Sequence, residues 1–325
     1  MSVRHAMPAK PGAAHPAPPF PLRPPPRGAV GLACALAWGA LLACDRSETQ
    51  GPAAARPGEP SAAAAPRVVS LSLAGTRFLL ALGARSQLVG ASPESIEALE
   101  LGDLPAVDLD AAPGLAPDLV LLGGGALGAA EGPPLRALRE AGARVVEFAP
   151  HDFEDLLALF REVGPQVVGA AEASRFERAF SLPLAELAGS SYGQPRPRVV
   201  GLVGVEPLAL AGGHSFETDL IETAGASSAT HASEETRLAL DPGGWARIAA
   251  DLAVHFGPRA LSEAERARVR ALVPGEIPLL FFELDTARFW LESPAEDARR
   301  LRQAILALAP GAGAPGSPRA DGGSQ

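Results

Sequence analysis

The stretch RVVSLSLAGTRFLLALGARSQLVGAS, residues 67–92, decides the fold class of this chain of 325 residues. It opens with a short β-branched run, Arg67–Leu71, which follows a proline and predicts a buried strand. A helical stretch, Thr76–Leu82, comes next, and a second apolar run, Leu88–Ala91, predicts another strand. Strands that alternate with helices along a chain predict an α/β fold with a parallel sheet.

Two more apolar runs extend this unit, at Asp118–Leu122 and Arg144–Phe148, and both predict buried strands. The stretch Leu135–Ala141 lies between them and predicts a helix. We therefore expect residues 67–152 to form one α/β lobe.

The same arrangement recurs further along the chain. PRVV stands at 66–69 and again at 197–200, and LAPDLVLLGG at 115–124 is echoed by IAADLAVHFG at 248–257. Short apolar strands also resemble one another by chance. The similar internal spacing favours a second α/β lobe, which we place at 196–309, with a parallel-type sheet flanked by helices.

The segment 153–195 between the two units predicts linking helices. Gly164-Pro165 is expected to end the first of them. A second helix can run from about Gln166 to Gly189, a length of roughly 35 Å at 1.5 Å per residue. Pro183 falls inside it and is expected to kink it or end it early.

The N-terminus reads as an export signal. Residues 28–43, GAVGLACALAWGALLA, form a short apolar run directly after Arg27. That run is shorter than the roughly 20 residues of a membrane-spanning helix, so residues 1–43 predict a signal peptide rather than a short anchor helix. Leu41–Cys44 resembles a bacterial lipobox, which makes Cys44 the expected lipidation site. Residues 44–66 predict a disordered tether, and residues 310–325 predict a disordered tail.

The charge of the body excludes one large class of function. Residues 1–43 hold four basic groups and no acid, which leaves 24 basic against 37 acidic residues and a formal charge of −13. An acidic body argues against nucleic-acid binding. Both cysteines lie before the body and Lys10 is the only lysine, so neither a cysteine nucleophile nor a P-loop is expected. We expect neither an enzyme nor a bound cofactor or metal.

Four segments together resemble a known family. They are residues 67–92, VDLDAAPGLAPDLVLL at 107–122, FREVGPQVVGAAEA at 160–173 and VEPLALAGGHSFETDLIETAGA at 205–226. In order and spacing they are similar to the helical-backbone (class III) periplasmic binding proteins that serve ABC importers of cobalamin, haem and iron-siderophores. The resemblance implies two α/β lobes, one long helix between them, and a ligand in the cleft.

The resemblance also implies docking sites for an importer permease. In the family a carboxylate on the outer face of each lobe meets arginines of the permease, and Asp110 holds that place in the N-terminal lobe. Its alternative role is to complement a helix dipole. In the C-terminal lobe the matching position is Gly243, with Asp241 and Glu235 as nearby substitutes. The loop between Gly90 and Asp108 lacks the aromatic side chains of a cobalamin cleft.

Candidate ligand-binding residues follow from the α/β architecture, because ligands bind beyond the C-terminal strand ends and near helix N-termini. Trp245 also fits core packing, since Ile248 follows it at helical spacing, and Trp290 fits either role. His214 follows two glycines and could be an axial haem ligand, a polar contact or a solvent-exposed loop histidine. The full set of candidates is Ser72, Thr76, Gly124, His151, Glu206, His214, Trp245 and Trp290.

A nucleotide-binding enzyme is the rival interpretation. Residues 123–128, GGGALG, satisfy the dinucleotide pattern GxGxxG after a predicted strand. Gly132-Pro133-Pro134 interrupts the helix that should present its N–H groups to a pyrophosphate.

We therefore expect a binding protein: a monomeric lipoprotein outside the cytoplasm, in the periplasm or at the cell exterior, anchored to the membrane by its N-terminal lipid. A sensor or scaffold of the same fold, without transport, is the alternative.

Overall fold

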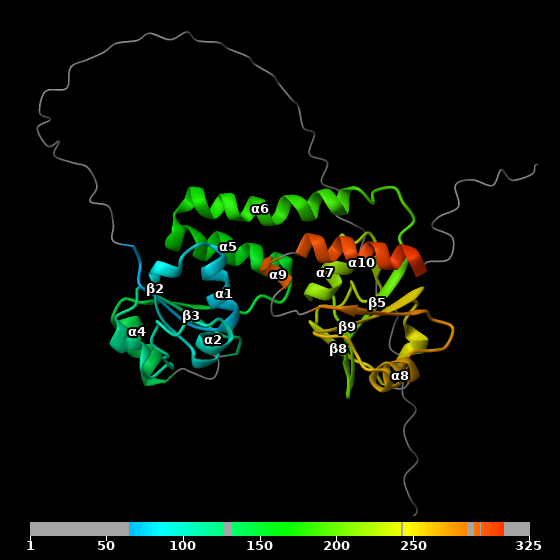
Figure 1. Ribbon diagram of the computed structural model, residues 1–325, viewed down its shortest axis with the longest axis horizontal. Coiled ribbons are helices and arrows are strands. Elements are labelled where there is room, and N and C mark those ends of the chain that lie inside the picture. Colours follow the sequence, from blue (N-terminus) through cyan, green and yellow to red (C-terminus); the bar gives the residue numbers. More distant parts are fainter. Residues whose placement is uncertain (1–64, 126–131, 242, 285–288, 293, 309–325) are drawn as a thin grey trace, which may run out of the picture. The chain divides into compact units, whose positions relative to one another are not determined.

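The computed structural model describes residues 65–308, apart from 126–131, 242, 285–288 and 293 (Figure 1). The expected signal peptide, Cys44, the tether and the tail lie outside these residues. The described chain is an α/β protein with two sheets, each flanked by helices. Two lobes joined by helices were predicted, and this fold class is confirmed.

The N-terminal lobe is built on a parallel sheet with strand order β2-β1-β3-β4. All four strands fall where the apolar runs predicted them, to within one residue at either end. β3 is buried along its whole length, as expected of a central strand between two layers of helices. The strands are β1 Val68–Leu71, β2 Leu88–Ala91, β3 Leu119–Leu122 and β4 Arg144–Glu147; the helices are α1 Leu73–Ala81, α2 Pro93–Ala98 and α4 Pro133–Glu140.

Helix α1 begins three residues earlier than predicted. The side chain of Ser72 accepts a hydrogen bond from the backbone N–H of Gly75 at 3.2 Å and so caps the first turn. The helix ends before Gly83, whose φ of 73° favours glycine. These two local signals set the length of the helix.

The sheet of the C-terminal lobe is mixed rather than parallel. Its order is β10-β9-β5-β6-β8, and β7 pairs with β5. β5 is parallel to β7 and β9, but the chain reverses at Glu206-Pro207 and β6 runs antiparallel to both β5 and β8. The expectation of a second parallel-type sheet is thus corrected at this hairpin. The elements are β5 Arg198–Val205, β6 Leu208–Ala211, α7 Phe216–Thr223, β7 Ser227–Ser228, β8 Arg237–Ala239, β9 Leu252–Gly257, α8 Glu263–Leu272, β10 Leu279–Glu283, α9 Phe289–Glu292 and α10 Pro294–Leu308.

The sequence repeat corresponds to one structural device used twice. In the first lobe the backbone N–H of Arg67 donates to Asp118 Oδ2 at 2.7 Å. In the second lobe the backbone N–H of Arg198 donates to Asp251 Oδ2 at the same distance. Each bond joins the starts of two neighbouring parallel strands, β1 with β3 and β5 with β9. The repeated aspartate therefore aligns the central strands of both lobes.

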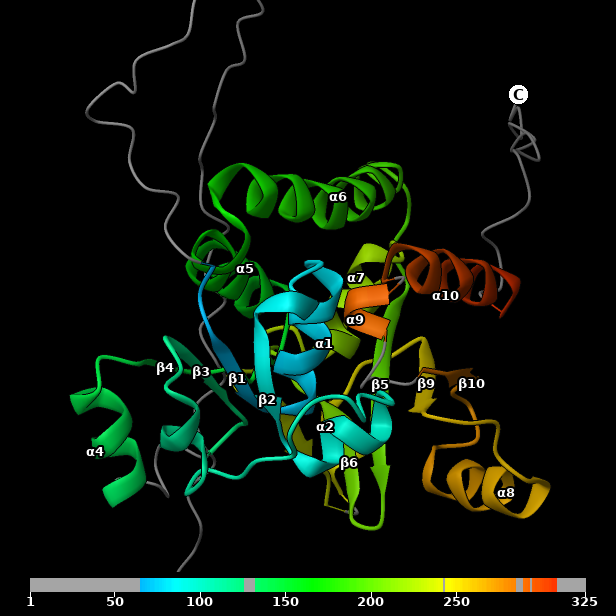
Figure 2. The same ribbon diagram turned by 60° about the vertical axis from the view of Figure 1, so that its left-hand side comes forward.

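The linking helices differ from their prediction. α5 spans Phe153–Val168 and continues through Gly164-Pro165. It ends at Gly169, where φ is 83°. A Cβ on Gly164 would lie 2.9 Å from the Cβ of Ala173, so this glycine permits the close packing of α5 on α6 instead of ending the helix. α6 spans Ala170–Gly189 and passes Pro183 without ending early, and the two helices lie side by side (Figures 1 and 2).

One apolar cluster connects the N-terminal sheet, the linking helices and the helices of the second lobe. At its centre the ring of Phe78 lies 4.8 Å from that of Phe148 and 5.0 Å from that of Phe160. Phe153 continues the cluster toward Phe216 on α7, at 5.7 Å. Between residues 65 and 308, gaps excepted, no helix is long and apolar enough to cross a lipid bilayer.

Candidate functional site

The first candidates hold the strand ends of the N-terminal lobe together. The hydroxyl of Ser72 donates to the carbonyl of Phe148 at 3.4 Å and is largely buried. Thr76 is fully buried, and its hydroxyl donates to the carbonyl of Ser72 at 2.9 Å. Both hydroxyls are used inside the lobe, so we expect them to position the strand ends rather than to contact a ligand.

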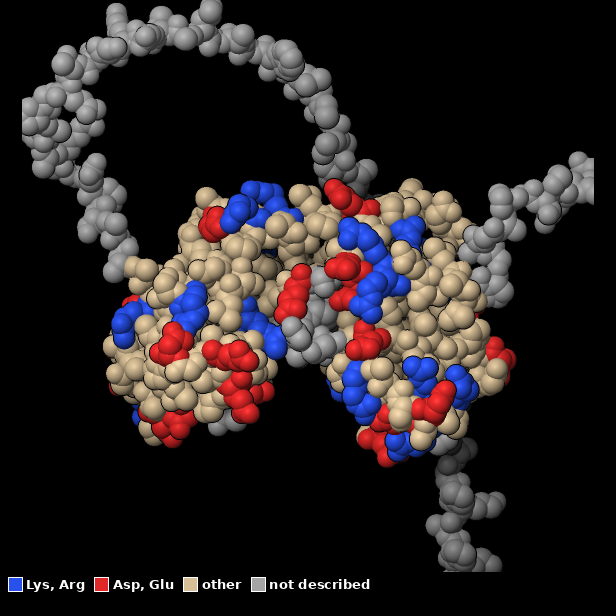
Figure 3. Space-filling model, in the orientation of Figure 1, with Lys and Arg blue, Asp and Glu red and all other residues tan. Residues whose placement is uncertain are grey.

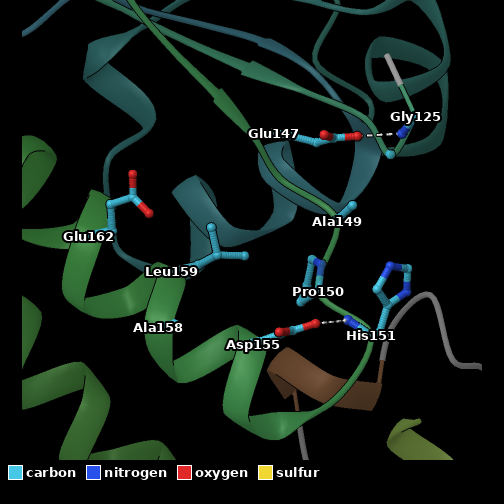
Figure 4. Close-up of a pocket in the computed structure, with 10 residues that line it drawn as sticks. Gly125, Glu147, Ala149, Pro150, His151, Asp155, Ala158, Leu159 and Glu162 are labelled. Atoms are coloured by element: carbon cyan, nitrogen blue, oxygen red, sulfur yellow. Dashed lines mark hydrogen bonds between the residues drawn. The ribbon is translucent and has the colours of Figure 1, made fainter. Parts of the chain in front are cut away.

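Gly124 and His151, 27 positions apart in the chain, line one pocket of about 480 Å³ (Figure 4). The pocket lies where β3 and β4 end against the first turns of α5. Glu147 accepts a hydrogen bond from the backbone N–H of Gly125, and Asp155 accepts one from the backbone N–H of His151 at 3.1 Å. With its carboxylates and one imidazole, the pocket favours a ligand group that is cationic or donates hydrogen bonds.

His214 meets the N-terminal lobe at a second place. Its Nδ1 lies 3.2 Å from Oδ2 of Asp152, a residue 62 positions earlier. Asp152 is buried and also caps α5, because its Oδ1 accepts the N–H of Asp155 at 2.8 Å. The imidazole itself keeps 58% of its side-chain surface exposed. A buried carboxylate therefore orients an accessible imidazole at the junction of the two lobes.

Two glycines shape the loop that carries this histidine. Gly212 follows β6, and its N–H donates to the carbonyl of Thr236 at 2.9 Å. A Cβ at this position would overlap the carbonyl oxygen of Glu235, just before β8. Only glycine therefore allows the backbone of the loop to come this close to that segment. Ser215 then caps α7 by accepting the N–H of Thr218 at 3.2 Å. The loop places His214 directly before a helix N-terminus.

A second carboxylate reaches across the same junction. Asp219 on α7 accepts the backbone N–H of Phe153, the first residue of α5, at 2.6 Å. Burial raises the pKa of the Asp219 carboxyl to about 7, against the opposing effect of this hydrogen bond. Negative charges on Asp152 and Glu222 raise the pKa further.

The remaining candidates do not join either group. Glu206 lies at the tip of the β5–β6 hairpin beside a pocket of about 230 Å³. Trp245 packs into the core of the C-terminal lobe, and its buried Nε1 has no hydrogen-bond partner among the residues that the structure describes. This position favours the core-packing role for Trp245. Trp290 belongs to α9, but its side chain lies outside the described part of the structure.

The two docking candidates are exposed. Asp110 lies after α2 in the N-terminal lobe. Asp241 forms an ion pair with Arg247 at 3.2 Å, with both side chains largely exposed.

Neither a metal centre nor a dinucleotide site is supported by the described geometry. Within residues 65–308, outside the gaps, no three His, Cys, Asp or Glu side chains converge to hold a metal ion. Gly128 of the GxGxxG pattern lies outside the described residues. Helix α4 begins with Pro133 and Pro134, and its N-cap Gly132 has no side chain. Proline has no backbone N–H, so the two prolines in the first turn of α4 remove two of the donors that a pyrophosphate would need.

The fold is known from solved structures, although no family model and no curated protein matches the chain. An ABC transporter substrate-binding protein from Listeria monocytogenes aligns with 74% of this chain and 98% of its own, with a TM-score of 0.56 and 13% identity. A periplasmic haem-binding protein from Pseudomonas aeruginosa aligns with 75% of this chain and 94% of its own, with a TM-score of 0.55 and 22% identity. The periplasmic vitamin B12-binding protein of Vibrio cholerae covers 75% and 98%, with a TM-score of 0.54 and 16% identity. The chain thus has the two-lobed fold of class III periplasmic binding proteins.

The pairing of His214 with Asp152 and the contact of Asp219 with α5 were not predicted. A signal for them exists in the sequence. HDFED at 151–155 and HSFETD at 214–219 are similar, and each begins a helix with a polar cap followed by phenylalanine. In the structure Phe153 and Phe216 contact each other, so the two similar strings are the halves of one junction.

Proposed function

We propose that this protein binds a solute outside the cytoplasm for an ABC importer, and that the solute is a metal-centred ligand of the haem, corrinoid or ferric siderophore kind. The observation that carries the proposal is the oriented, exposed imidazole of His214 at the junction of the two lobes. The fold supports it, because proteins of the same fold include binders of haem and of vitamin B12. Binding rather than catalysis is the proposed activity.

The chemistry of the pair suits a metal-centred solute. Asp152 accepts from Nδ1 of His214 and so favours the tautomer that carries its proton there. The other nitrogen, Nε2, then keeps its lone pair and has no partner among the residues that the structure describes. A carboxylate that orients a histidine in this way raises its strength as a metal ligand. We propose His214 as the residue that contacts the metal of the solute, with Asp152 as its positioning residue.

A titration of the full-length protein tests the function. Haemin, cyanocobalamin, ferric siderophores and NAD(H) are added in turn, and absorbance and corrected tryptophan fluorescence are followed. We expect saturable binding of one metal-centred solute. His214→Ala should weaken it at least about tenfold, which corresponds to about 1.4 kcal/mol.

His231→Ala is the matched control, because His231 is also exposed and also bound through Nδ1 to a carboxylate, that of Glu222 at 2.8 Å. Its affinity should equal that of the unmodified chain. An unchanged affinity in His214→Ala would remove this histidine from the site. A response to NAD(H) alone would favour the enzyme, and no response at all would favour a sensor or scaffold.

Docking to a permease is proposed for the acidic end of the N-terminal lobe. Asp110 is one of six exposed carboxylates between residues 94 and 110, a stretch without a basic residue. Acidic side chains gather on the end of this lobe where α2 lies (Figures 1 and 3). Such a surface complements arginines on a partner. For the C-terminal lobe we propose Asp241, whose ion pair with Arg247 would have to open.

Attachment to a membrane through Cys44 is the last part of the proposal. Two acyl chains on this cysteine would anchor the protein stably, since each buried CH₂ contributes about 0.8 kcal/mol. Cys44→Ser should therefore move the protein from the membrane fraction to the soluble fraction of the cells that export it. Cys34→Ser, in the same apolar run, is the control and should leave it bound. Equal fractionation of both variants would exclude lipidation of Cys44.

A further inference from the structure

The two lobes meet at a junction formed by the first residues of helices α5 and α7. Two helix N-termini, those of α5 and α7, meet there, and Phe153 and Phe216 contact each other at their first residues. Helix N-termini carry unsatisfied N–H groups and partial positive charge. Two helix N-termini that meet are stabilised by carboxylates, because carboxylates accept these N–H groups and offset the partial positive charge.

Asp219 supplies such a carboxylate from the opposite lobe. Its Oδ2 accepts the first N–H of α5, which no residue of α5 itself can satisfy. Asp152 satisfies the N–H of Asp155 in the same helix. The N-terminus of α5 is therefore capped partly by its own residue and partly by a residue of the C-terminal lobe. If the lobes separate, the bond from Phe153 to Asp219 has to break.

The surroundings of Asp219 are rich in negative charge. Asp152 and Glu154 face it from α5, and Glu222 faces it from α7 itself. Two histidines are each bound to one of these acids, His214 to Asp152 and His231 to Glu222, and a third, His151, directly precedes Asp152 in the chain.

Two further helices, α6 and α10, pack against α7. α10 carries Asp297, which is paired with Arg300, and α6 contributes the ring of Phe180 beside Phe153. A charge on Asp219 thus meets several acids and little water.

We propose that Asp219 is a proton-dependent clasp that holds the two lobes together at the α5–α7 junction. A neutral carboxyl still accepts the N–H of Phe153 through its carbonyl oxygen, and it does not repel the surrounding acids. An ionised carboxyl accepts that bond more strongly but remains buried among like charges. The consequence for ligand capture rests on the proposed function, since His214 and Asp152 belong to the same junction.

The direction of the pH dependence follows from linkage. In an open junction the solvated carboxyl would titrate near its ordinary pKa of 3.8, whereas burial in the closed junction raises that pKa to about 7. The closed junction therefore binds the proton more tightly, so proton uptake favours closure. The stabilisation of the closed junction by this proton is complete below about pH 4 and is lost as the pH rises through about 7.

Spin labels on the two lobes of the ligand-free, full-length chain test the clasp. Cys34→Ser and Cys44→Ser remove the native thiols, and Glu97→Cys with Arg268→Cys adds one exposed label site to each lobe. We expect the interlobe distance distribution to lengthen or broaden between pH 5.5 and 8.5, with a midpoint near pH 7. Asp219→Asn, an uncharged acceptor of similar shape, should hold the low-pH distribution throughout.

Three controls separate Asp219 from its neighbours. Glu154→Gln removes an exposed acid of the same helix end and should keep the pH step. His214→Gln and His231→Gln should keep it as well, because the proposal assigns the pH step to the Asp219 carboxyl and not to either histidine pair. A step that persists in Asp219→Asn, or that disappears in His214→Gln alone, would overturn the proposal.

A second measurement needs no substitution at Asp219. With ¹⁵N-phenylalanine incorporated, the amide signal of Phe153 reports directly on its bond to the carboxylate. We expect this signal to titrate with a midpoint near pH 7. A signal that is flat across this range would contradict the clasp. Both measurements use protein without ligand, so failure of the solute-binding proposal would leave them interpretable.

Discussion

The Gly212→Ala variant is expected to lose about 2–4 kcal/mol of unfolding free energy and to bind solute poorly. The added Cβ would overlap the carbonyl oxygen of Glu235 and lie too close to the backbone of Thr236. These are backbone atoms, which cannot rotate aside, so β6 must move away from β8. Overpacking of this kind costs about 1–3 kcal/mol, and the bond from Gly212 to Thr236 contributes about 1 kcal/mol more.

The same displacement would move His214, two residues further on. Urea denaturation and the solute titration check the two effects in one protein sample. Gly275→Ala is the matched control in the same lobe, because a Cβ there meets no atom within 4 Å. It should change the unfolding free energy by less than about 0.5 kcal/mol. Equal stability of Gly212→Ala and the control would show that the loop relaxes without cost.

The Phe78→Ala variant is expected to lose about 3–5 kcal/mol of unfolding free energy. Phe78 is fully buried, and its ring contacts those of Phe148 and Phe160. Removing it leaves a cavity where α1, the end of β4 and helix α5 meet. Because domains are stable by only about 5–15 kcal/mol in total, this loss is a large part of the whole.

Chemical denaturation measures the loss, and Leu182→Ala on α6 is its control. The side chain of Leu182 is 55% exposed, so its truncation should cost less than about 0.5 kcal/mol. The slope of the unfolding free energy against denaturant should stay unchanged if the fold is kept. A loss below about 1 kcal/mol in Phe78→Ala would mean that the cluster collapses around the missing ring.

Local patterns were sufficient to predict the four strands of the N-terminal lobe, although not its helix α2. Its four strands are short apolar runs that alternate with helical segments, and such runs specify buried strands wherever two layers of helices cover them. The repeated PRVV and Asp-Leu strings predicted a second lobe for the same reason. Residue preferences at strands and helix caps act over only a few positions, so they can be recognised without knowledge of the fold.

The candidate site was predicted only in part, because its contacts join distant segments. The strand-end rule placed Gly124, His151 and His214 in loops that follow predicted strands, but β6, the strand before His214, runs antiparallel to β5. It did not show that Gly124 and His151 share a pocket, or that His214 pairs with Asp152 across 62 positions. Whether a loop histidine is solvated or oriented by a carboxylate depends on the opposite lobe, which no local pattern describes.

The sequence by itself determined the α/β class and the two lobes, because short apolar strands and helical segments can be recognised locally. Only the tertiary structure decided that α5 continues through Pro165, that β6 reverses beside β5, and that Asp219 completes the cap of α5. In each of these cases packing against a partner outweighs a local preference. The helix continues past Gly164 because α6 packs on it, β6 lies between β5 and β8, and the N–H of Phe153 is accepted by a carboxylate 66 positions away.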